Sequence, residues 1–314
     1  MDIATIRKNA AAGDPQAQTM LARRHVIGRE APYDPEEACR LLAMAAAQDF
    51  PLALLISATL AALGIGRRQS FDDAIGFLAR AAATGSERAI GQLEALGGVK
   101  GFDPDAWLEP PRSLQHASAP RIFSTEQLIP PPVCSWLASQ AILRLRPTLV
   151  KDAVLRAAVA SSDRSNTGCG FSKIEGDLVL QMTRLRLAVW TGIKPEFQEA
   201  PNILHYERGQ HYGPHYDFVR VDEVRGLQDE LTSWGQRRAT ALVYLNDDYE
   251  GGETHFPRLG WSYKGKTGDA LLFWNLSESG EREELSLHAG SPVTAGTKII
   301  LSQWIREKVV PVGH

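Results

Sequence analysis

The sequence predicts an α+β protein in which an α-helical repeat segment precedes a domain built of short strands. Two observations support this prediction. Residues 1–97 repeat with a period of 36. From about residue 201 the apolar residues fall in short runs separated by Gly-rich turns, a pattern that is typical of strands. At 314 residues the chain is long enough for two domains.

The repeat is marked by small residues. Alanines recur at two stations, Ala10, Ala46 and Ala82, and Ala17, Ala53 and Ala89. A period near 34–36, with alanine where two helices cross, indicates a helix-turn-helix solenoid. The segment resembles tetratricopeptide-like repeats of the Sel-one-like kind. Because two and a half units are few for an independent solenoid, we expect the repeats to pack on the domain that follows. Binding of a peptide or partner is the alternative.

Residues 98–120 are rich in Gly, Pro and Ser and are expected to be a linker. The second domain then spans 121–314. Within it, 124–160 is expected to be helical, broken by the three prolines at 130–132, and a second helix is expected over 178–189. A polar stretch at 220–237 is either a solvated loop or a mobile lid.

Three residues have the character of metal ligands. His215 and Asp217 lie two residues apart between strand-forming residues, so both side chains can point to one face of a strand. His288 is flanked by a second strand-like run. Two imidazoles and one carboxylate can occupy one face of an octahedral metal and leave the other open, as in non-haem Fe(II) oxygenases. Lys298, ten residues after His288, could hold the far carboxylate of a dicarboxylate cosubstrate.

Residues 201–305 resemble the catalytic core of prolyl 4-hydroxylases. The matching stations are Tyr206, His215-Tyr216-Asp217, Arg238-Ala239-Thr240, Tyr244–Asp247, Gly251–Thr254, Phe256-Pro257, Gly268–Ala270, Phe273, His288–Gly290, Pro292-Val293, Gly296, Lys298 and Trp304. Arg164-Ser165 resembles an upstream Arg-x-Ser element of the family, with one residue fewer.

The resemblance implies a double-stranded β-helix, or jelly-roll, with supporting helices. It also implies Fe(II), 2-oxoglutarate as cosubstrate, and O2, with ascorbate as a further expected cofactor. His215, Asp217 and His288 would be the catalytic metal ligands, and Lys298 would pair with the 5-carboxylate of 2-oxoglutarate. A carboxylate at position 217 favours hydroxylation over halogenation, because related halogenases have a small residue there.

Further residues have expected roles at this site. The cosubstrate contacts are Tyr206, Tyr244 and Thr240, and the substrate contacts are Arg164, Arg238 and Trp304. For the two tyrosines, packing in the core with a satisfied hydroxyl is the alternative. His205, His211 and His255 are not expected to be ligands.

The composition excludes several classes of protein. A net charge of −3 gives no electrostatic reason to expect nucleic-acid binding. Three widely separated cysteines form neither a disulfide framework nor a zinc motif, which favours a reducing compartment. The first residues lack the apolar core of a signal peptide, and no apolar run is long enough to span a membrane. We therefore expect a cytoplasmic enzyme without a membrane partner.

The sequence does not decide between two classes of substrate. The leading hypothesis is a hydroxylase of a prolyl-type C–H in a peptide or protein, releasing succinate and CO2. The alternative is a hydroxylase of a free, cyclic amino acid in natural-product biosynthesis. A hypothesis of another class is a repeat-based scaffold with an inactive barrel, which the intact set of His215, Asp217, His288 and Lys298 argues against.

Overall fold

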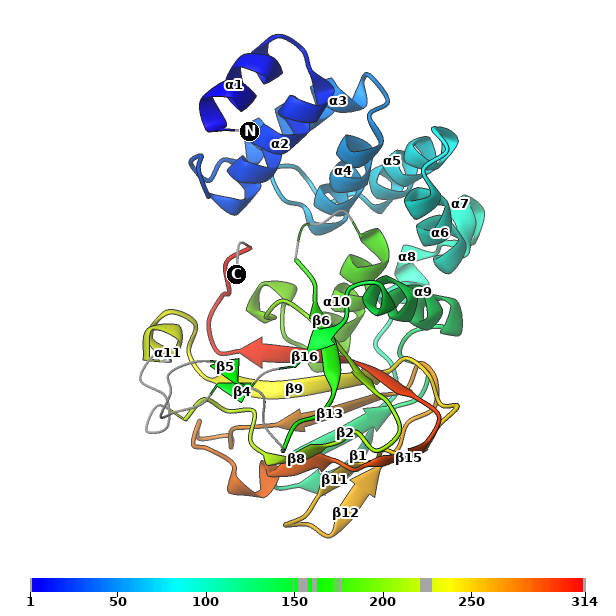
Figure 1. Ribbon diagram of the computed structural model, residues 1–314, viewed down its shortest axis with the longest axis vertical. Helices are drawn as coiled ribbons and strands as arrows, with labels where there is room; N and C mark the ends of the chain where they lie inside the picture. Colours follow the sequence, from blue (N-terminus) through cyan, green and yellow to red (C-terminus); the bar gives the residue numbers. More distant parts are fainter. Residues whose placement is uncertain are drawn as a thin grey trace. The chain divides into compact units, whose positions relative to one another are not determined.

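The computed structural model divides the chain into two compact units (Figure 1). It describes residues 2–148, 150–151, 158–159, 163–172, 174, 177–220 and 228–312. The first unit, here called the repeat unit, comprises Met1–Glu109, Ser172–Leu185 and Pro311–His314. The second, here called the barrel unit, comprises Pro110–Phe171 and Arg186–Val310. No described helix is both long and apolar enough to cross a membrane.

The repeat unit is a series of helices in which each packs on the next. The helices are α1 (Ile3–Ala11), α2 (Pro15–Ile27), α3 (Pro35–Ala46), α4 (Pro51–Leu63), α5 (Phe71–Ala83) and α6 (Glu87–Ala95). The sequence period of 36 is visible at their ends. Asp34 and Ser70 cap α3 and α5 by accepting an N–H of the first turn, and Gly28 and Gly64 end α2 and α4 at φ of 70° and 67°.

The core of the repeat unit includes a segment from much later in the chain. Ile174 packs in the same apolar cluster as Ile56 and Leu60 of α4. The side-chain oxygen of Gln92, on α6, accepts a hydrogen bond of 2.6 Å from the backbone N–H of Leu178. Leu178 begins α10 (Leu178–Thr191), a helix that the sequence predicts over 178–189. Residues 172–185 thus complete the repeat unit.

The expected linker at 98–120 is largely structured. It contains α7 (Gly98–Gly101), α8 (Pro104–Trp107) and strand β1 (Leu114–Ser118). The indole N–H of Trp107 donates to the backbone oxygen of Met182 at 2.8 Å, which ties α8 to the later segment of the same unit. The division between the compact units falls between Glu109 and Pro110, instead of at a linker between 97 and 121.

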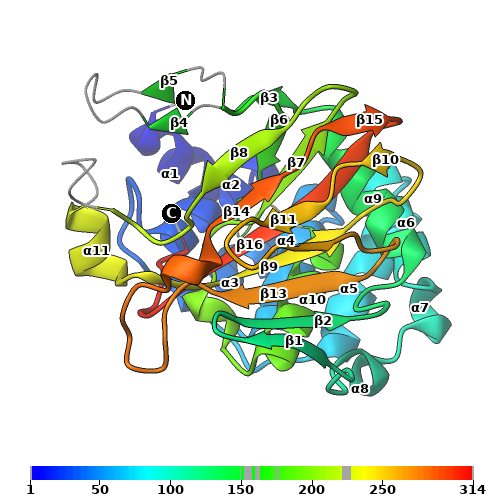
Figure 2. The same ribbon diagram turned by 90° about the horizontal axis from the view of Figure 1, so that it is seen from below.

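The barrel unit is a double-stranded β-helix of two antiparallel sheets. The larger has the order β1-β2-β13-β9-β16-β7-β6-β3, and the smaller the order β12-β11-β14-β8. Figure 2 shows β8, β14 and β11 lying over the larger sheet. The remaining strands of the larger sheet are β2 (Arg121–Thr125), β3 (Arg146–Pro147), β6 (Thr167–Gly170), β7 (Asn202–Tyr206), β9 (Arg237–Tyr244), β13 (Ala270–Trp274) and β16 (Lys298–Arg306). The smaller contains β8 (Tyr212–His215), β11 (Thr254–Phe256), β12 (Trp261–Tyr263) and β14 (His288–Gly290).

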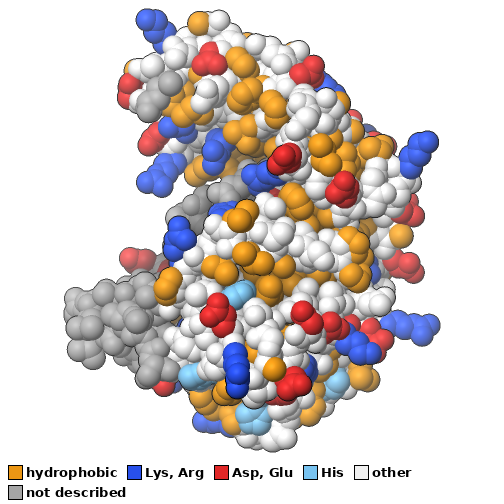
Figure 3. Space-filling view, turned by 45° about the vertical axis from the view of Figure 1, so that its right-hand side comes forward, with side chains coloured by type: hydrophobic (Ala, Val, Ile, Leu, Met, Phe, Trp, Pro, Cys, Tyr) orange, Lys and Arg blue, Asp and Glu red, His pale blue; other side chains and the backbone are white. Residues whose placement is uncertain are grey.

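Apolar side chains fill the space between the sheets. Phe256 and Phe273 meet edge to face, with ring centroids 5.3 Å apart, and both are completely buried. Two short ladders lie beside the sheets, β4 (Val150–Lys151) with β5 (Ala158–Val159) and β10 (Glu250–Gly251) with β15 (Val293–Ala295). On the face drawn in Figure 3, side chains of both charge signs are interspersed between apolar patches.

The prediction of helix over 124–160 is correct only for residues 131–142, and residues 124–125 belong to β2. The only helix described in that range is α9 (Pro131–Ile142), and β3, β4 and β5 follow it. Pro131 and Pro132 begin α9 instead of breaking it, because the first-turn N–H groups of a helix need no partner within the helix. In the polar stretch at 220–237, α11 (Gln228–Trp234) is a helix, and residues 221–227 lie outside the described part of the chain.

Candidate metal centre and cosubstrate pocket

Two strands of the smaller sheet bring together the three residues with the character of metal ligands. β14 pairs antiparallel with β8 so that His288 lies opposite His215, and Asp217 follows β8 by two residues. His215 Nε2 lies 3.8 Å from Asp217 Oδ1, and His288 Nε2 lies 3.6 Å from Asp217 Oδ2. One ligand atom from each residue falls within 4.8 Å of the others. This spacing allows all three to bind one ion.

The hydrogen bonds of the two histidines fix which ring nitrogen faces the centre. His215 Nδ1 lies 2.8 Å from the carbonyl oxygen of Gly213, and His288 Nδ1 lies 3.0 Å from that of Ser286. A carbonyl only accepts, so each Nδ1 must carry the proton. In a neutral imidazole the Nε2 lone pair is then directed at the centre, which is the usual arrangement of a metal-bound histidine.

The electrostatics of the centre favour a bound cation. Burial and the neighbouring His288 lower the pKa of His215 to about 3, so its ring is neutral. Burial by itself would raise the pKa of Asp217, but His288, His215 and a hydrogen bond from Thr240 outweigh it and leave the pKa lowered. One ionised carboxylate beside two imidazoles whose Nε2 atoms face the centre is a donor set that fits Fe(II).

Behind the centre, a short hydrogen-bond chain orients the carboxylate. Thr240 Oγ1 donates to Asp217 Oδ2 at 2.6 Å, and Asn275 Nδ2 donates to Thr240 Oγ1 at 3.0 Å. All three residues are buried. Such second contacts fix the orientation of a ligand and tune its basicity.

Lys298 lies at the start of β16, opposite Tyr206 of β7. It is only 2% exposed, and its Nζ donates to the backbone oxygen of Gly252 at 2.6 Å. Burial lowers the pKa of this ammonium to about 7. Gly252 has a φ of 68°, and a Cβ there would approach Lys298 Cδ to 3.2 Å, so a glycine both adopts the turn and leaves room for the lysine stem. No carboxylate in the described part of the chain forms an ion pair with Lys298.

One cavity joins the three-residue centre to Lys298. Tyr206, for which the sequence predicts a cosubstrate contact, and Arg164 and Trp304, for which it predicts substrate contacts, also line it. Burial raises the pKa of Tyr206, so its hydroxyl keeps its proton and can donate. Tyr212, which the sequence did not single out, also lines the cavity and stacks on His215 with ring centroids 3.5 Å apart.

Three other residues with expected contacts do not line this cavity. Thr240 instead donates to Asp217. The hydroxyl of Tyr244 bonds Thr254 Oγ1 at 2.9 Å, which matches the alternative of a packed core tyrosine. The guanidinium of Arg238 lies over the ring of Trp274 at 4.9 Å. His205, His211 and His255 do not line the cavity either, and each contacts a nearby hydroxyl, on Thr167, Ser165 and Ser262 respectively.

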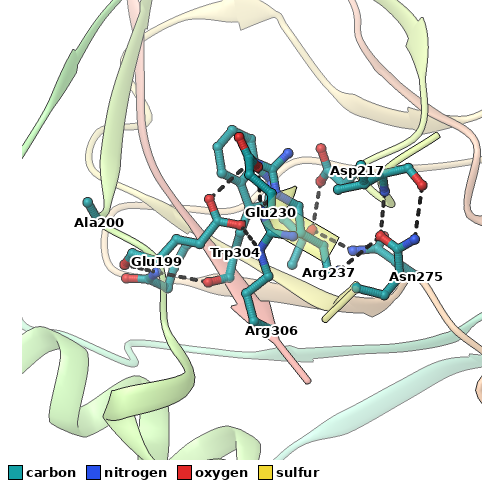
Figure 4. A network of polar contacts seen from close by, with 12 residues as sticks. Glu199, Ala200, Asp217, Glu230, Arg237, Asn275, Trp304 and Arg306 are labelled. Carbon is teal, nitrogen blue, oxygen red and sulfur yellow. Dashed lines mark hydrogen bonds and ion pairs between the residues drawn. The ribbon is translucent and has the colours of Figure 1, made fainter. Parts of the chain in front are cut away.

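Trp304 rests on a buried ionic network that the sequence analysis missed (Figure 4). The guanidinium of Arg237 lies 3.6 Å from the centroid of the Trp304 ring and forms two hydrogen bonds, of 2.7 and 3.0 Å, with Glu199. Arg306, with no exposed surface, pairs with Glu199 and with Glu230 of α11. In the sequence, Arg237 and Arg306 stand at the ends of apolar runs. This position does not by itself indicate which carboxylate each arginine pairs with.

Comparisons with known proteins agree with this geometry. Residues 201–306 match the family model described as 2OG-Fe(II) oxygenase superfamily. A probable prolyl 4-hydroxylase 7 of Arabidopsis thaliana is 32% identical over 250 residues, which cover 74% of this chain and 75% of the relative.

Two solved structures are also similar. The 2OG complex of a viral collagen prolyl hydroxylase from Paramecium Bursaria Chlorella virus-1 is 27% identical, with a TM-score of 0.44, covering 59% of this chain and 95% of that one. A Sel1 repeat protein from Oxalobacter formigenes is 27% identical, with a TM-score of 0.29, covering 34% of this chain and 85% of that one.

The barrel and its centre define a 2OG-Fe(II) oxygenase, which is an Fe(II)- and 2-oxoglutarate-dependent dioxygenase. Within that superfamily, the chain belongs to the prolyl 4-hydroxylase family.

Proposed function

We propose that the protein hydroxylates a prolyl C–H of a peptide or protein and releases succinate and CO2. The observation that carries the proposal is that one cavity is lined both by the two-histidine, one-carboxylate centre and by Lys298, a buried lysine with no carboxylate partner among the described residues. The prolyl 4-hydroxylase names of the relatives support the choice of substrate class.

In this proposal His215, Asp217 and His288 hold Fe(II). When bound with 2-oxoglutarate, the iron supplies the activation of O2 that C–H hydroxylation requires. The protein contributes the orientation of the ligands, through the carbonyls that fix the two Nδ1 protons and through Thr240 behind Asp217. It also keeps the centre poor in water, because Asp217 and His288 are buried.

Lys298 would bind the 5-carboxylate of 2-oxoglutarate, and Tyr206 would donate a hydrogen bond to the same cosubstrate. A buried cation without a carboxylate partner is costly in isolation, and a dicarboxylate ligand would supply the missing charge. Nζ lies 5.3 Å from the centroid of the Tyr206 ring, so both groups face one region of the cavity.

On the substrate side, Arg164 and Trp304 are the proposed contacts. Both line a second cavity of about 250 Å3, which shares Leu204 and Ser302 with the first. The indole nitrogen of Trp304 is buried and has no hydrogen-bond partner in the described chain, so a substrate carbonyl that reached it would satisfy it. Space beyond the centre suits the flanking residues of a peptide better than a free amino acid.

The test is succinate formation from 2-oxoglutarate, compared between proline-containing peptides and free proline, with mass spectrometry to detect one added oxygen. We expect peptides to stimulate turnover and to gain the oxygen, and His288→Ala to abolish both. Turnover that free amino acids stimulate and peptides do not would favour the natural-product alternative and contradict the proposal.

A further inference from the structure

The repeat unit contains a second feature that looks like a binding site. A cavity of about 260 Å3 is lined by Arg23 of α2, Leu52 and Ile56 of α4, and Arg88 of α6. All four residues belong to the repeat unit, and none belongs to the catalytic machinery proposed above. Any ligand of this cavity would therefore be bound by the repeat unit alone.

The repeat places these residues on one face. Leu52 and Arg88 are 36 residues apart, which is one period, so they occupy equivalent positions on α4 and α6. Ile56 is in the same way equivalent to Met20 of α2, which lines an adjoining cavity together with Arg23. The second helix of each repeat thus turns the same side toward a shared surface, as solenoids do where they bind extended chains.

The charges on this face are not compensated within the described chain. No hydrogen bond or ion pair to either guanidinium is present there, and Arg88 Nε is buried without a partner. The other half-buried arginines of the repeats are paired, Arg24 with Glu30 and Arg67 with Asp73.

Exposure does not explain the unpaired state of these two arginines. The remaining arginines without a partner in the repeats, Arg7, Arg29 and Arg68, are exposed to water, whereas Arg23 and Arg88 are half-buried. A half-buried guanidinium without a protein partner is left to water, and the buried Nε of Arg88 has no acceptor in the described chain, so a carboxylate ligand would supply what is missing.

We propose that this face binds a peptide segment in which an acidic side chain lies next to an apolar one. The guanidinium groups match a carboxylate, which they can bind through two parallel hydrogen bonds. Leu52, which is half-buried above a core that contains Ile56, provides an apolar contact that a free phosphate would not use. A net charge of −3 also argues against a general affinity for polyanions. The inference goes beyond the proposed hydroxylation and does not depend on it.

The test measures binding of a fluorescein-labelled peptide of alternating leucine and glutamate to the full chain, by fluorescence anisotropy. The matched probe has glutamine in place of glutamate. Arg23→Gln and Arg88→Gln should each weaken binding of the acidic peptide about tenfold, since each removes charge-assisted hydrogen bonds. Arg68→Gln is the control, because it removes an exposed, unpaired arginine of the same unit that does not line the cavity.

Folding of the variants is checked by thermal unfolding, where Arg23→Gln and Arg88→Gln should match or exceed wild type because neither loses an ion pair. A clear fall in the unfolding midpoint would contradict the unpaired state on which the proposal stands. Equal affinity for the two probes, binding by Arg23→Gln and Arg88→Gln that equals that of Arg68→Gln, or displacement of the peptide by low concentrations of inorganic phosphate would each overturn it.

Succinate formation in the same variants keeps this proposal separate from the proposed function. We expect it to stay at the wild-type rate with a short proline peptide, because the catalytic groups lie in the barrel unit.

Discussion

At the scale of single residues, the fold changes the pKa of the buried Lys298 ammonium in a way that bears directly on cosubstrate binding. Its pKa is lowered to about 7 by burial, and the Gly252 carbonyl is a weak substitute for a counter-charge. A lysine in this state should bind a carboxylate strongly and should destabilise the empty protein. Both properties can be measured with one substitution.

Lys298→Met should weaken 2-oxoglutarate binding by about a hundredfold or more, since removal of one partner of a buried charge pair costs roughly 3–5 kcal/mol. Fe(II) affinity should change little, because Lys298 does not contact the three metal-binding residues. Isothermal titration with each ligand provides the measurement. Unchanged 2-oxoglutarate affinity would show that another residue holds the carboxylate.

The same substitution should stabilise the ligand-free protein. The folded pKa of about 7 lies below the ordinary lysine value of 10.5, so the unfolded chain holds the proton more tightly between these two pH values. The free energy of unfolding of the wild type should therefore rise with pH from about 7 to about 10, and the cost of the buried charge is largest below pH 7. Denaturant unfolding at pH 6.5 and pH 9 should show that Lys298→Met is more stable by roughly 2–5 kcal/mol at the lower pH and loses most of this advantage at the higher. An equal advantage at both pH values would contradict the assignment.

Binding of 2-oxoglutarate should also take up a proton above pH 7. The empty site is largely deprotonated there, whereas the carboxylate of the ligand favours the charged lysine. Calorimetric binding enthalpies at pH 8 should depend on the ionisation enthalpy of the buffer, and those at pH 6 should depend on it much less. Lys298→Met serves as the control, in which the buffer dependence should disappear.

At the scale of secondary-structure elements, the sequence predicted the strands that carry the metal-binding residues better than the segments around them. His215 lies on β8 as predicted, although the strand ends before Asp217, and Lys298 opens the long apolar run that is β16. Within 124–160 the three consecutive prolines were interpreted as a break in a helix, although two of them start α9. The short strand β3 depends on pairing with β6, which lies later in the chain, and local patterns do not reveal such a partner.

The roles of Thr240 and Tyr244 could not be assigned from the sequence for a related reason. Both lie on β9, but a sequence motif does not show what a polar side chain contacts. Thr240 meets Asp217, and Tyr244 meets Thr254 on the opposing sheet. Contacts of this kind depend on the distance between sheets, which only the structure supplies.

The ionic network beside Trp304 predicts that Arg306 of β16 contributes more to stability than Glu230 of α11. Arg306→Met should lower the free energy of unfolding by about 3–5 kcal/mol, because it leaves the carboxylate of Glu199 short of one of its two buried cationic partners. Glu230→Gln is the matched variant, and it removes only the outer, partly exposed pair, so it should cost about 1 kcal/mol or less. Denaturant unfolding of both variants tests this, and equal losses would contradict it.

At the scale of the whole molecule, the sequence predicted two domains but assumed that each is one continuous stretch. The 36-residue period identified the repeats because it is a local signal. It could not show that residues 172–185, which lack the period, complete the same unit. The contact of Gln92 with Leu178 joins positions 86 residues apart in the chain.

A chain beginning at Pro110 tests this organisation. It should lose solubility and thermal stability, because Ile174 and the start of α10 would lose the apolar cluster and the Gln92 side chain that cover them. It should retain 2-oxoglutarate decarboxylation in whatever fraction stays folded, because every residue assigned to the metal and cosubstrate lies after it. The measurements are the unfolding midpoint and succinate per folded molecule. A fully soluble, stable product would show that the repeats do not cover this segment.

The boundary between the units falls inside α10, after Leu185, and this limits how the protein can be rearranged by recombination. A single crossover near residue 110 would replace the repeats with those of a relative. The new helices would then have to pack against the original 172–185 segment, to which they are not matched. A functional chimera must exchange that segment as well. The repeats and the oxygenase are therefore expected to have diverged together, with substitutions in one part compensated in the other, instead of behaving as interchangeable modules.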